Sequence, residues 1–310
     1  MEFLRLLEGL RTPFFDTVLQ FFTLFGEETI FMVVAMAFFW CVDKKTGYLL
    51  LYVCFFGNII NSFLKLIFIV PRPWVLDPNF TIVESARAEA TGYSFPSGHT
   101  QNAAGLFLGV AWARKELWLR IPCVAIALLV GFSRMYLGVH TPADVLVSLG
   151  VALLLVALAY PLIWRAWDNP KWFIPLVGFM LAVAVALILY IELVPMPANA
   201  IVQFSLECNE SAYKMIGTAF GFAPVLWLER KYIRFSEKAV WWAQLLKLAL
   251  GLAIVIAVRT LLKEPLLMLC GGHNAGNALR YFLMVLVGGA LWPMTFKFFG
   301  KLGQKKEAAA

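Results

Sequence analysis

The sequence predicts an all-α integral membrane protein, a helical bundle of about nine transmembrane helices. Of its 310 residues, 61% are hydrophobic and only 15% are charged. Soluble domains carry roughly 45–50% apolar and about 25% charged residues. Apolar segments that approach the roughly 20 residues needed for a spanning helix recur along the whole chain. The composition therefore excludes a soluble protein with a large core and favours a polytopic membrane protein.

Nine apolar segments are the candidate spans. The first and the third are shorter than the others, and we expect them to be tilted or to extend into their flanks. The nine segments cover residues 27–42, 46–69, 100–113, 117–135, 142–164, 172–194, 212–229, 239–262 and 276–297.

The N-terminal residues differ from these segments. Arg5, Glu8, Arg11 and Asp16 interrupt the apolar faces of residues 1–25, a pattern typical of a helix that lies in the membrane interface. A tenth, short span is the alternative. The chain is therefore divided into an N-terminal interfacial helix, a core that holds the polar motifs below and a C-terminal transmembrane extension, at residues 1–26, 27–168 and 169–310.

Lysine and arginine residues are concentrated at one end of the predicted spans. Cytoplasmic loops are enriched in these residues, so we expect that end to be cytoplasmic. The net charge of +7 is then explained by membrane orientation rather than by nucleic-acid binding. The basic residues at this end are Lys44, Lys45, Arg114, Lys115, Arg120, Arg165, Lys171, Arg230, Lys231, Arg234, Lys238, Lys297, Lys301, Lys305 and Lys306.

Three polar stretches interrupt the apolar sequence at the opposite, extracytoplasmic end. They read KLIFIVPRP, YSFPSGHTQN and SRMYLGVHTPAD, and they contain two of the three histidines in the chain. Ionisable side chains at membrane depth are costly and usually functional. The candidate site residues in these stretches are Lys65, Arg72, Ser97, Gly98, His99, Arg134, His140 and Asp144.

Five of these residues are suited to binding a phosphoryl group. Lys65, Arg72 and Arg134 form a triple cation, in which arginine binds oxygens in pairs and lysine acts as a compact charge. Ser97 and Gly98 precede an apolar helix, whose free backbone N–H groups can point at an anion. Glycine at this position lets the anion approach the backbone closely.

The remaining three residues are suited to moving a phosphoryl group and a proton. Thr141 and Pro142 predict a helix start, which places Asp144 in the first turn, four residues after His140. Asp144 can accept a hydrogen bond from one nitrogen of His140 and leave the other free to attack. His99, from a different segment, can protonate the leaving oxygen.

Each of these features alone has a structural explanation. A histidine in an apolar protein is often a packing residue, and an arginine at a helix end often anchors the helix at the interface. Pro-Ser-Gly is an ordinary turn. Three cations, two histidines and an aspartate on one face of the membrane are not explained by packing, so a chemical function is favoured.

The three stretches resemble the three-part signature of the type 2 phosphatidic acid phosphatase superfamily. That signature is a lysine separated by six residues from Arg-Pro, then Pro-Ser-Gly-His, then Ser-Arg followed by a histidine and an aspartate. The sequence has all three parts in order and at full spacing, at residues 65–73, 96–99 and 133–144. The resemblance covers roughly residues 45–160.

This resemblance implies a six-helix-type phosphatase core that needs no metal and no cofactor. It implies that His140 is the nucleophile and forms a phospho-histidine, that His99 is the general acid and that Asp144 orients His140. The basic residues are expected to bind phosphate.

We therefore predict a multi-pass membrane phosphatase that hydrolyses a lipid phosphomonoester or pyrophosphate on the extracytoplasmic or lumenal side. Its expected partners are the bilayer and a membrane lipid, with no nucleic acid, and its oligomeric state stays open. The alternative is a soluble sugar phosphate, because nine spans and the run RPWVLDPNF resemble the glucose-6-phosphatase branch. A vanadate-dependent haloperoxidase is disfavoured by the span count, and a transporter does not explain the three motifs.

Access to the site separates the two substrate classes. A lipid requires a lateral opening lined by Leu, Phe and Val at the level of His99 and His140, and the apolar segments beside the motifs favour this. The loop at residues 74–95 joins two motifs, so it should border the pocket and select the leaving group. Three residues expected to be solvated charges in this loop are Glu84, Arg87 and Glu89.

Three further residues with reactive side chains are predicted to lie on the same, extracytoplasmic side. His273 is interpreted as a helix-start or loop residue, because the signature is complete without it. Cys208 and Cys270 could form a disulfide outside the cytoplasm, with two unpaired thiols as the alternative.

Overall fold

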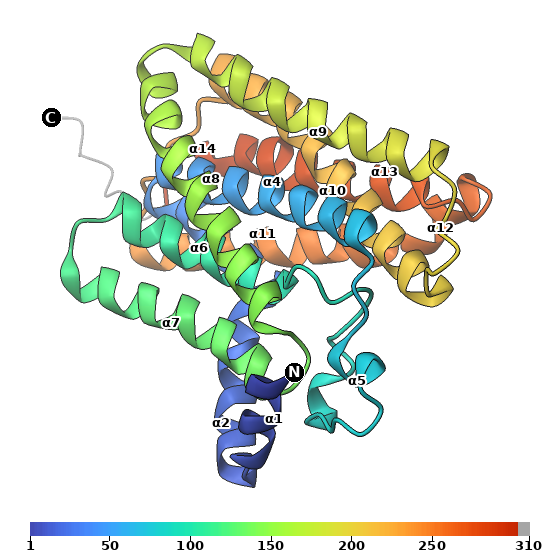
Figure 1. The fold of residues 1–310 in the computed structure, drawn as a ribbon. Coiled ribbons are helices and arrows are strands. Elements are labelled where there is room, and N and C mark those ends of the chain that lie inside the picture. Colours follow the sequence, from blue (N-terminus) through green and yellow to red (C-terminus); the bar gives the residue numbers. More distant parts are fainter. Residues whose placement is uncertain (303–310) are drawn as a thin grey trace, which may run out of the picture.

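A computed structural model describes residues 1–302, and all regular structure in that range is helical (Figure 1). Lys305 and Lys306, predicted to be cytoplasmic, lie outside the described residues, as does the end of the predicted extension. The α-helices are α1 (Glu2–Gly9), α2 (Pro13–Thr23), α3 (Glu28–Ala37), α4 (Lys44–Phe68), α5 (Pro73–Leu76), α6 (Gly98–Ala113), α7 (Leu117–Tyr136), α8 (Pro142–Asp168), α9 (Phe173–Leu193), α10 (Val202–Leu228), α11 (Trp241–Leu261), α12 (Lys263–Leu269), α13 (Ala275–Leu286) and α14 (Phe296–Phe299).

Helix α4 forms the centre of the bundle, and α6, α8 and α10 pack around it (Figure 1). It begins after Asp43, whose carboxylate accepts a hydrogen bond from the backbone N–H of Lys45 at 3.1 Å. Its buried residues lie on all faces, as expected for a helix in the middle of a bundle. It ends at Ile69, which adopts a left-handed conformation. This end brings Lys65 to the candidate site.

The expectation of nine spans is not confirmed. Each predicted segment is helical, but within residues 1–302 six helices are long and apolar enough to cross a membrane. A seventh is possible if residues 13–26 and 28–42, which are bent by 52°, form one broken span. Helix α6 has only 16 residues. Helix α10 is 27 residues long, but Glu207, Glu210 and Lys214 interrupt its apolar sequence.

Residues 1–26, predicted as one interfacial helix, form two short helices that project from the bundle (Figure 1). The break occurs because Thr12 caps α2, its hydroxyl accepting from the N–H of Phe15 at 3.3 Å, and Pro13 is the first helical residue. Helix α2 packs against α7. Arg11 donates to the carbonyl of Tyr136 at 2.9 Å and fixes this contact.

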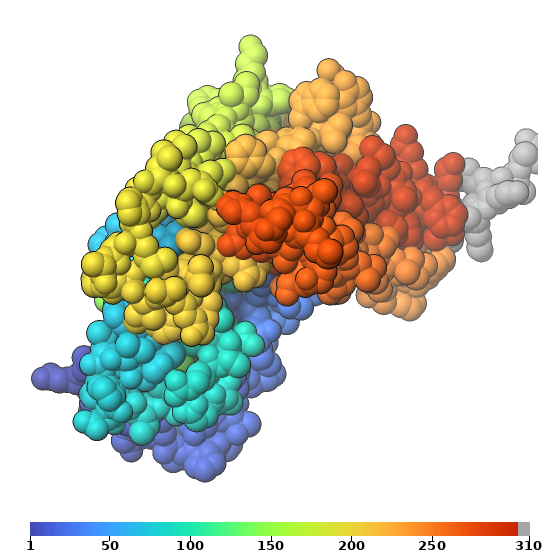
Figure 2. All heavy atoms as spheres, turned by 90° about the vertical axis from the view of Figure 1, so that its right-hand side faces the viewer, coloured from blue at the N-terminus to red at the C-terminus, as the bar shows by residue number. Residues whose placement is uncertain are grey.

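The C-terminal helices pack directly onto the core. Helix α10 contacts α4 on one side and α13 on the other, where Gly217 lies against the backbone of Ala278. Figure 2 shows the segment around the start of α10, in yellow, beside the loop at residues 74–95, in cyan to green. A hydrogen bond from the N–H of Gly92 to the carboxylate of Glu207, at 2.6 Å, joins the two. The extension therefore reaches the candidate site.

Candidate active site

The start of α8 positions His140 and Asp144. Thr141 and Asp144 form a capping box, in which the Asp144 carboxylate accepts from the Thr141 N–H at 2.8 Å and the Thr141 hydroxyl accepts from the Asp144 N–H at 3.3 Å. The same carboxylate oxygen, Oδ2, lies 3.2 Å from Nδ1 of His140. The sequence prediction that Asp144 contacts one nitrogen of His140 is therefore confirmed in the geometry.

Hydrogen bonds around this pair fix the tautomer of His140. His140 and Asp144 are 2% and 1% exposed, and the hydroxyl of Ser94 donates to the same Oδ2 atom. An ionised carboxylate accepts hydrogen bonds only, so Nδ1 of His140 carries the proton and Nε2 presents a lone pair. Burial lowers the pKa of His140, and the charge of Arg72 lowers it further, so the ring is neutral at neutral pH.

Arg72 lies against the free nitrogen of His140. Its Nη1 atom is 2.9 Å from His140 Nε2 and donates to the carbonyl of Val139 at 3.0 Å. Its Nε atom donates to the carbonyl of Gly92 at 2.9 Å, and Nη2 donates to that of Thr91. The guanidinium is thus held by backbone carbonyls, and none of these contacts is to a carboxylate.

The loop that holds Arg72 also holds Lys65. The ammonium of Lys65, in the last turn of α4, donates to the carbonyl of Tyr93. Residues 91–93 therefore position both cations next to His140. Because the bonds are to neutral carbonyls, the positive charge remains available to an anion.

The first turn of α6 carries Gly98 and His99 to the same cavity. Ser97 caps the helix, its hydroxyl accepting from the N–H of Thr100 at 3.3 Å. Nothing lies within 4 Å of the position that a Cβ atom on Gly98 would occupy, so its backbone is open to a ligand. The Nε2 atom of His99 is buried and has no hydrogen-bond partner among residues 1–302.

Two predicted phosphate-binding residues, Ser97 and Arg134, are not among the residues that line the cavity. Both are fully buried. Arg134 donates to the hydroxyl of Thr23 at 3.0 Å, while its Nε and Nη2 atoms have no partner in the part of the chain that the structure describes. Its carbonyl accepts from the N–H of His140 at 3.2 Å, so Arg134 also holds the backbone of the α7–α8 loop.

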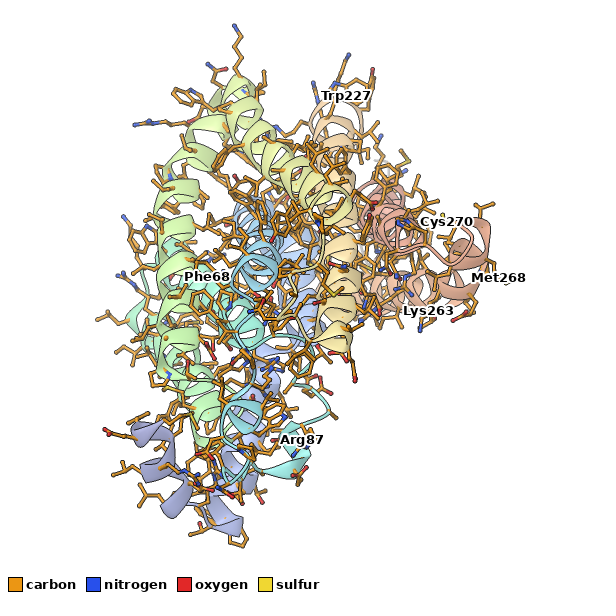
Figure 3. All side chains as sticks on the ribbon, turned by 45° about the vertical axis from the view of Figure 1, so that its right-hand side comes forward. Phe68, Arg87, Trp227, Lys263, Met268 and Cys270 are labelled. Carbon is orange, nitrogen blue, oxygen red and sulfur yellow. The ribbon has the colours of Figure 1, made fainter. Side chains whose placement is uncertain are left out.

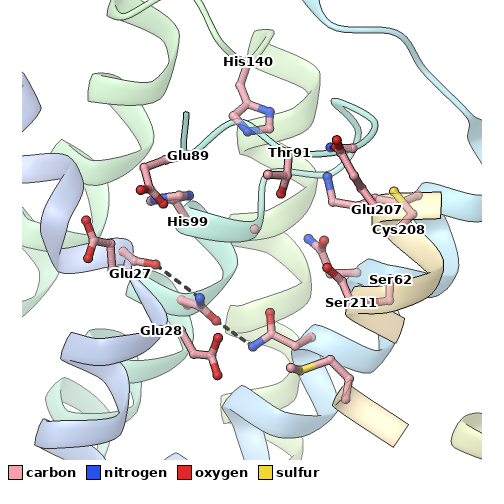
Figure 4. A pocket seen from close by; sticks show the side chains of 18 of the residues that line it. Glu27, Glu28, Ser62, Glu89, Thr91, His99, His140, Glu207, Cys208 and Ser211 are labelled. Carbon is pink, nitrogen blue, oxygen red and sulfur yellow. Dashed lines mark hydrogen bonds between the residues drawn. The ribbon is translucent and has the colours of Figure 1, made fainter. Parts of the chain in front are cut away.

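A cavity of about 310 Å³ joins these groups (Figure 4). Lys65, Arg72, Gly98, His99 and His140 line it, and Asp144 lies behind His140. None of the described residues that line this cavity is Leu, Phe or Val, and the lateral opening lined by these residue types stays a prediction. The cavity's other lining residues are Gly26, Glu27, Glu28, Thr29, Asn58, Asn61, Ser62, Glu89, Thr91, Gly92, Asn102, Glu207, Cys208, Ser211, Met215 and Arg259.

The loop at residues 74–95 borders this cavity, as predicted, through Glu89, Thr91 and Gly92. The expectation that Glu84 and Arg87 are solvated loop charges is confirmed, because they form an exposed ion pair at 2.8 Å. Glu89 is exposed as well, but it also lines the cavity beside His99 and Glu27 (Figure 4).

Sequence reasoning missed Ser94 and the polar residues on the transmembrane helices. Asn61 lies four residues before Lys65 on α4, and Asn102 lies three residues after His99 on α6. Residues at these spacings share a helix face. The signal that could have found them is an amide inside an apolar span, on the face that already carries a motif residue.

Of the three further residues, Cys208 lines the cavity, whereas His273 and Cys270 do not. His273 is exposed and accepts from the N–H of Ala275 at 3.2 Å, as expected for a helix-start residue. Cys270 lies in the turn after α12 (Figure 3), and both it and Cys208 are free thiols. Within residues 1–302 there is no group of three or more His, Cys, Asp or Glu side chains that could hold a metal ion.

Two families match the chain. Residues 46–168 match the PAP2 superfamily, and residues 213–305 match the PAP2 superfamily phosphatase, transmembrane extension. The first match contains the three polar motifs, and the second begins inside α10. Together they cover more than half of the chain.

Several curated proteins are similar to part of the chain. The chain is 38% identical over 100 residues to the undecaprenyl-diphosphatase BcrC of Bacillus subtilis. The matched region covers 32% of this chain and 48% of that protein. It is 28% identical over 164 residues to phosphatidylglycerophosphatase B of Bacillus subtilis, covering 48% and 75%. It is 27% identical over 155 residues to the lipid A 4′-phosphatase of Bacteroides thetaiotaomicron, covering 46% and 67%. The chain thus spans about half the length of the first of these relatives. No solved structure matches the chain.

Proposed function

Because the chain belongs to the PAP2 superfamily, we propose that it is a membrane-embedded phosphatase that hydrolyses a lipid phosphomonoester or pyrophosphate through a phospho-histidine. The observation that supports this most directly is the environment of His140. Its Nδ1–H is held by Asp144, and its unprotonated Nε2 lies 2.9 Å from Nη1 of Arg72, at a cavity that Lys65 and His99 also line. The relatives named above carry the names of lipid phosphatases.

The first step transfers the phosphoryl group to His140. The Nε2 lone pair attacks phosphorus in line, the bond from phosphorus to the leaving oxygen breaks, and the protonated form of His99 donates a proton to that oxygen. Burial and the nearby cations lower the pKa of His99, so its protonated form requires the negative charge of the bound phosphate beside it. The ring of His140 becomes positively charged, and the Asp144 carboxylate stabilises this charge through Nδ1–H.

The second step releases phosphate. A water molecule gives a proton to His99, which now acts as a base, and the water oxygen attacks the phosphorus of the phospho-histidine. The bond between nitrogen and phosphorus breaks, and its electron pair returns to Nε2. Inorganic phosphate leaves, and both histidines regain their starting states.

Positive charge and backbone donors stabilise the transferring group in this proposal. Lys65 and Arg72 face its oxygens, and the N–H groups of Gly98 and His99 have no partner among residues 1–302. Arg134, whose guanidinium keeps two unpartnered nitrogens, and Ser97 would contribute from behind the cavity wall. These cations supply the charge stabilisation that a metal ion supplies in other phosphatases.

The proposed site faces the extracytoplasmic side. Helix α4 runs from Lys44 and Lys45 to Lys65 at the cavity, and α8 runs from the site to Arg165. The cavity and the basic loops thus lie at opposite ends of the same helices, and basic loops are predominantly cytoplasmic.

The test is phosphate release by purified protein in detergent with EDTA, from undecaprenyl pyrophosphate and phosphatidylglycerol phosphate. Phosphate release from at least one of these two lipids without added metal ion and an acid-labile phosphoprotein that is absent in His140→Ala are expected, together with inhibition by vanadate. Activity that requires added Mg²⁺, or an unchanged phosphoprotein in the variant, would contradict the mechanism. The polar cavity also favours a second candidate, the hydrolysis of a soluble sugar phosphate.

A further inference from the structure

The candidate active-site cavity has two chemically different ends (Figure 4). One end holds the histidines and cations that act on phosphate. Away from these groups the lining includes uncharged hydrogen-bonding side chains, next to charged ones such as Glu28, and the proposed mechanism gives the uncharged ones no part. They are Asn58, Asn61, Ser62, Asn102 and Ser211.

The uncharged polar side chains lie on the same helix faces as the residues proposed to act on phosphate. On α4, Asn58, Asn61 and Ser62 lie seven, four and three residues before Lys65, so all four share one face. With a rise of about 1.5 Å per residue, these side chains lie roughly 4–11 Å from Lys65 along the helix. A group bonded to a phosphoryl group at Lys65 would meet them.

The amides at this end are held in fixed orientations. The Nδ2 atom of Asn58 donates to Oδ1 of Asn102 at 2.6 Å. The Nδ2 atom of Asn102 donates in turn to the carbonyl of Gly26 at 3.2 Å. This chain of hydrogen bonds links α4, α6 and the bend before α3, and it leaves the two amides pre-organised at the cavity wall.

Asn61 has an unused donor. It is only 5% exposed, it lines the cavity, and its Nδ2 atom has no hydrogen-bond partner among residues 1–302. Buried polar groups are nearly always hydrogen-bonded, so an unpartnered amide at a cavity wall indicates a ligand acceptor. Carboxylates of Glu27, Glu28 and Glu89 at the same cavity can accept hydrogen bonds.

We infer that this end of the cavity binds the hydroxyl groups of the leaving group. The inference rests on the proposed function and names its substrate class: a phosphate ester of a polyhydroxylated group, such as a glycerol or a sugar. Hydroxyl groups both donate and accept, which matches a cavity that offers both an unpaired amide donor and carboxylate acceptors. A phosphate attached directly to a hydrocarbon chain would bury these groups without partners.

The size of the cavity agrees with this class. A volume of about 310 Å³ lies at the lower end of the roughly 300–1,000 Å³ of small-molecule sites. That is room for a phosphoryl group and a small polyol. The polyol can be a lipid headgroup or a free molecule, since the recognised chemistry is the same.

The experiment compares kcat/KM for three probes: phosphatidylglycerol phosphate in micelles, dodecyl phosphate in micelles and glycerol 3-phosphate. We expect at least about a hundredfold preference for a glycerol ester over dodecyl phosphate, because a site built to bind hydroxyls rejects analogues that lack them. Preference for the lipid ester over glycerol 3-phosphate identifies a headgroup, and the reverse identifies a free polyol phosphate. A preference for dodecyl phosphate overturns the inference.

The variant Asn61→Leu removes the unused donor at similar volume. It should lower kcat/KM for the preferred glycerol ester by about 10–100-fold and that for dodecyl phosphate by less than about threefold. Asn209→Leu, a half-buried amide on α10 that does not line this cavity, is the matched control and should match the parent. An equal loss on both substrates indicates a structural role and overturns the inference.

Ser62→Ala is the second variant and is the milder change if Asn61→Leu fails to fold. It should reduce the preference for the glycerol ester over dodecyl phosphate by about threefold or more. An unchanged preference contradicts the inference. Failure of the proposed function gives a different result, because then none of the three probes releases phosphate in a manner that depends on His140.

Discussion

The core helices and the C-terminal extension contribute to the site in different ways. The motifs of the core, on α4, α6, α7, α8 and their loops, carry every side chain proposed to react with or bind phosphate. The extension supplies supports instead. Glu207 accepts from the N–H of Gly92, and Ser205 lies 2.9 Å from the hydroxyl of Tyr93. The same loop residues hold Arg72 and Lys65, so the extension acts on the chemistry through the loop.

This comparison indicates that the same catalytic core can be combined with different supporting helices. The first family match lies in the core, whereas the second lies in the extension. A substitution in the core should therefore change the rate on all substrates strongly. A substitution in the extension should change it moderately, and a substitution at the polar end should change selectivity.

The largest effect is expected in the core. His140→Ala should lower kcat for phosphatidylglycerol phosphate by at least about 10⁴-fold, because the phosphoryl group loses the atom that accepts it. Asp144→Asn should lose roughly 10²–10⁴-fold, because the tautomer is no longer fixed. His273→Ala changes an exposed histidine and should match the parent. Retention of more than about 1% activity by His140→Ala would rule out its assignment.

His99→Ala tests a second function of the core, protonation of the leaving group. It should lower kcat by roughly 10²–10⁴-fold on a lipid ester. An activated aryl phosphate needs little protonation of its leaving oxygen, so the loss on 4-nitrophenyl phosphate should be at least about tenfold smaller. Equal losses on both substrates would show that His99 is not the acid.

Glu207→Ala tests whether the extension supports the loop that holds the two cations. Without its carboxylate the loop at residues 91–93 loses a hydrogen bond, and both cations shift. We expect a loss of roughly 10–100-fold in kcat/KM, of equal size on the lipid and aryl esters. Glu210→Ala is the control, because Glu210 pairs with Lys214 on the same helix. A loss confined to one substrate would mean that Glu207 contacts the leaving group.

The smallest effect is expected where the N-terminal helices meet the core. A Cβ atom on Gly26 would lie 2.7 Å from the carbonyl oxygen of His99, so Gly26→Ala should destabilise the protein by about 1–3 kcal/mol. Gly150→Ala, in α8 with open space at its Cβ position, should be stabilising by about 0.5–1 kcal/mol. Thermal unfolding in detergent measures both, and equal melting temperatures would contradict the packing at Gly26.

The reactive end of the cavity could be predicted because its residues lie in short motifs. The spacing of His140 and Asp144 fixes their contact within one helical turn, and Thr141 and Pro142 mark where that turn begins. The meeting of Arg72 with His140 followed from the joint pattern, although these residues are 68 positions apart. Ser94 was missed because a serine in a loop has no spacing signal.

The polar end could not be predicted from local patterns. Asn58 meets Asn102 only because α4 packs on α6, and Glu207 reaches Gly92 only because α10 packs on α4. The span count failed for a related reason. Helix α6 is short and surrounded by α4, α7 and α8, so protein rather than lipid covers much of its surface, and hydropathy alone does not separate these cases.

The contact between Arg72 and His140 gives the proposed enzyme a way to discriminate against the phospholipids of the surrounding membrane. Nη1 of Arg72 donates to the nitrogen that would attack, at 2.9 Å, so the resting nucleophile is masked. A terminal phosphate carries a charge of about −1.5 to −2 at neutral pH and can draw the guanidinium away. The phosphodiesters of the surrounding bilayer carry a single negative charge and compete less well. Unmasking by charge would let a hydrolase work among abundant phospholipids without consuming them.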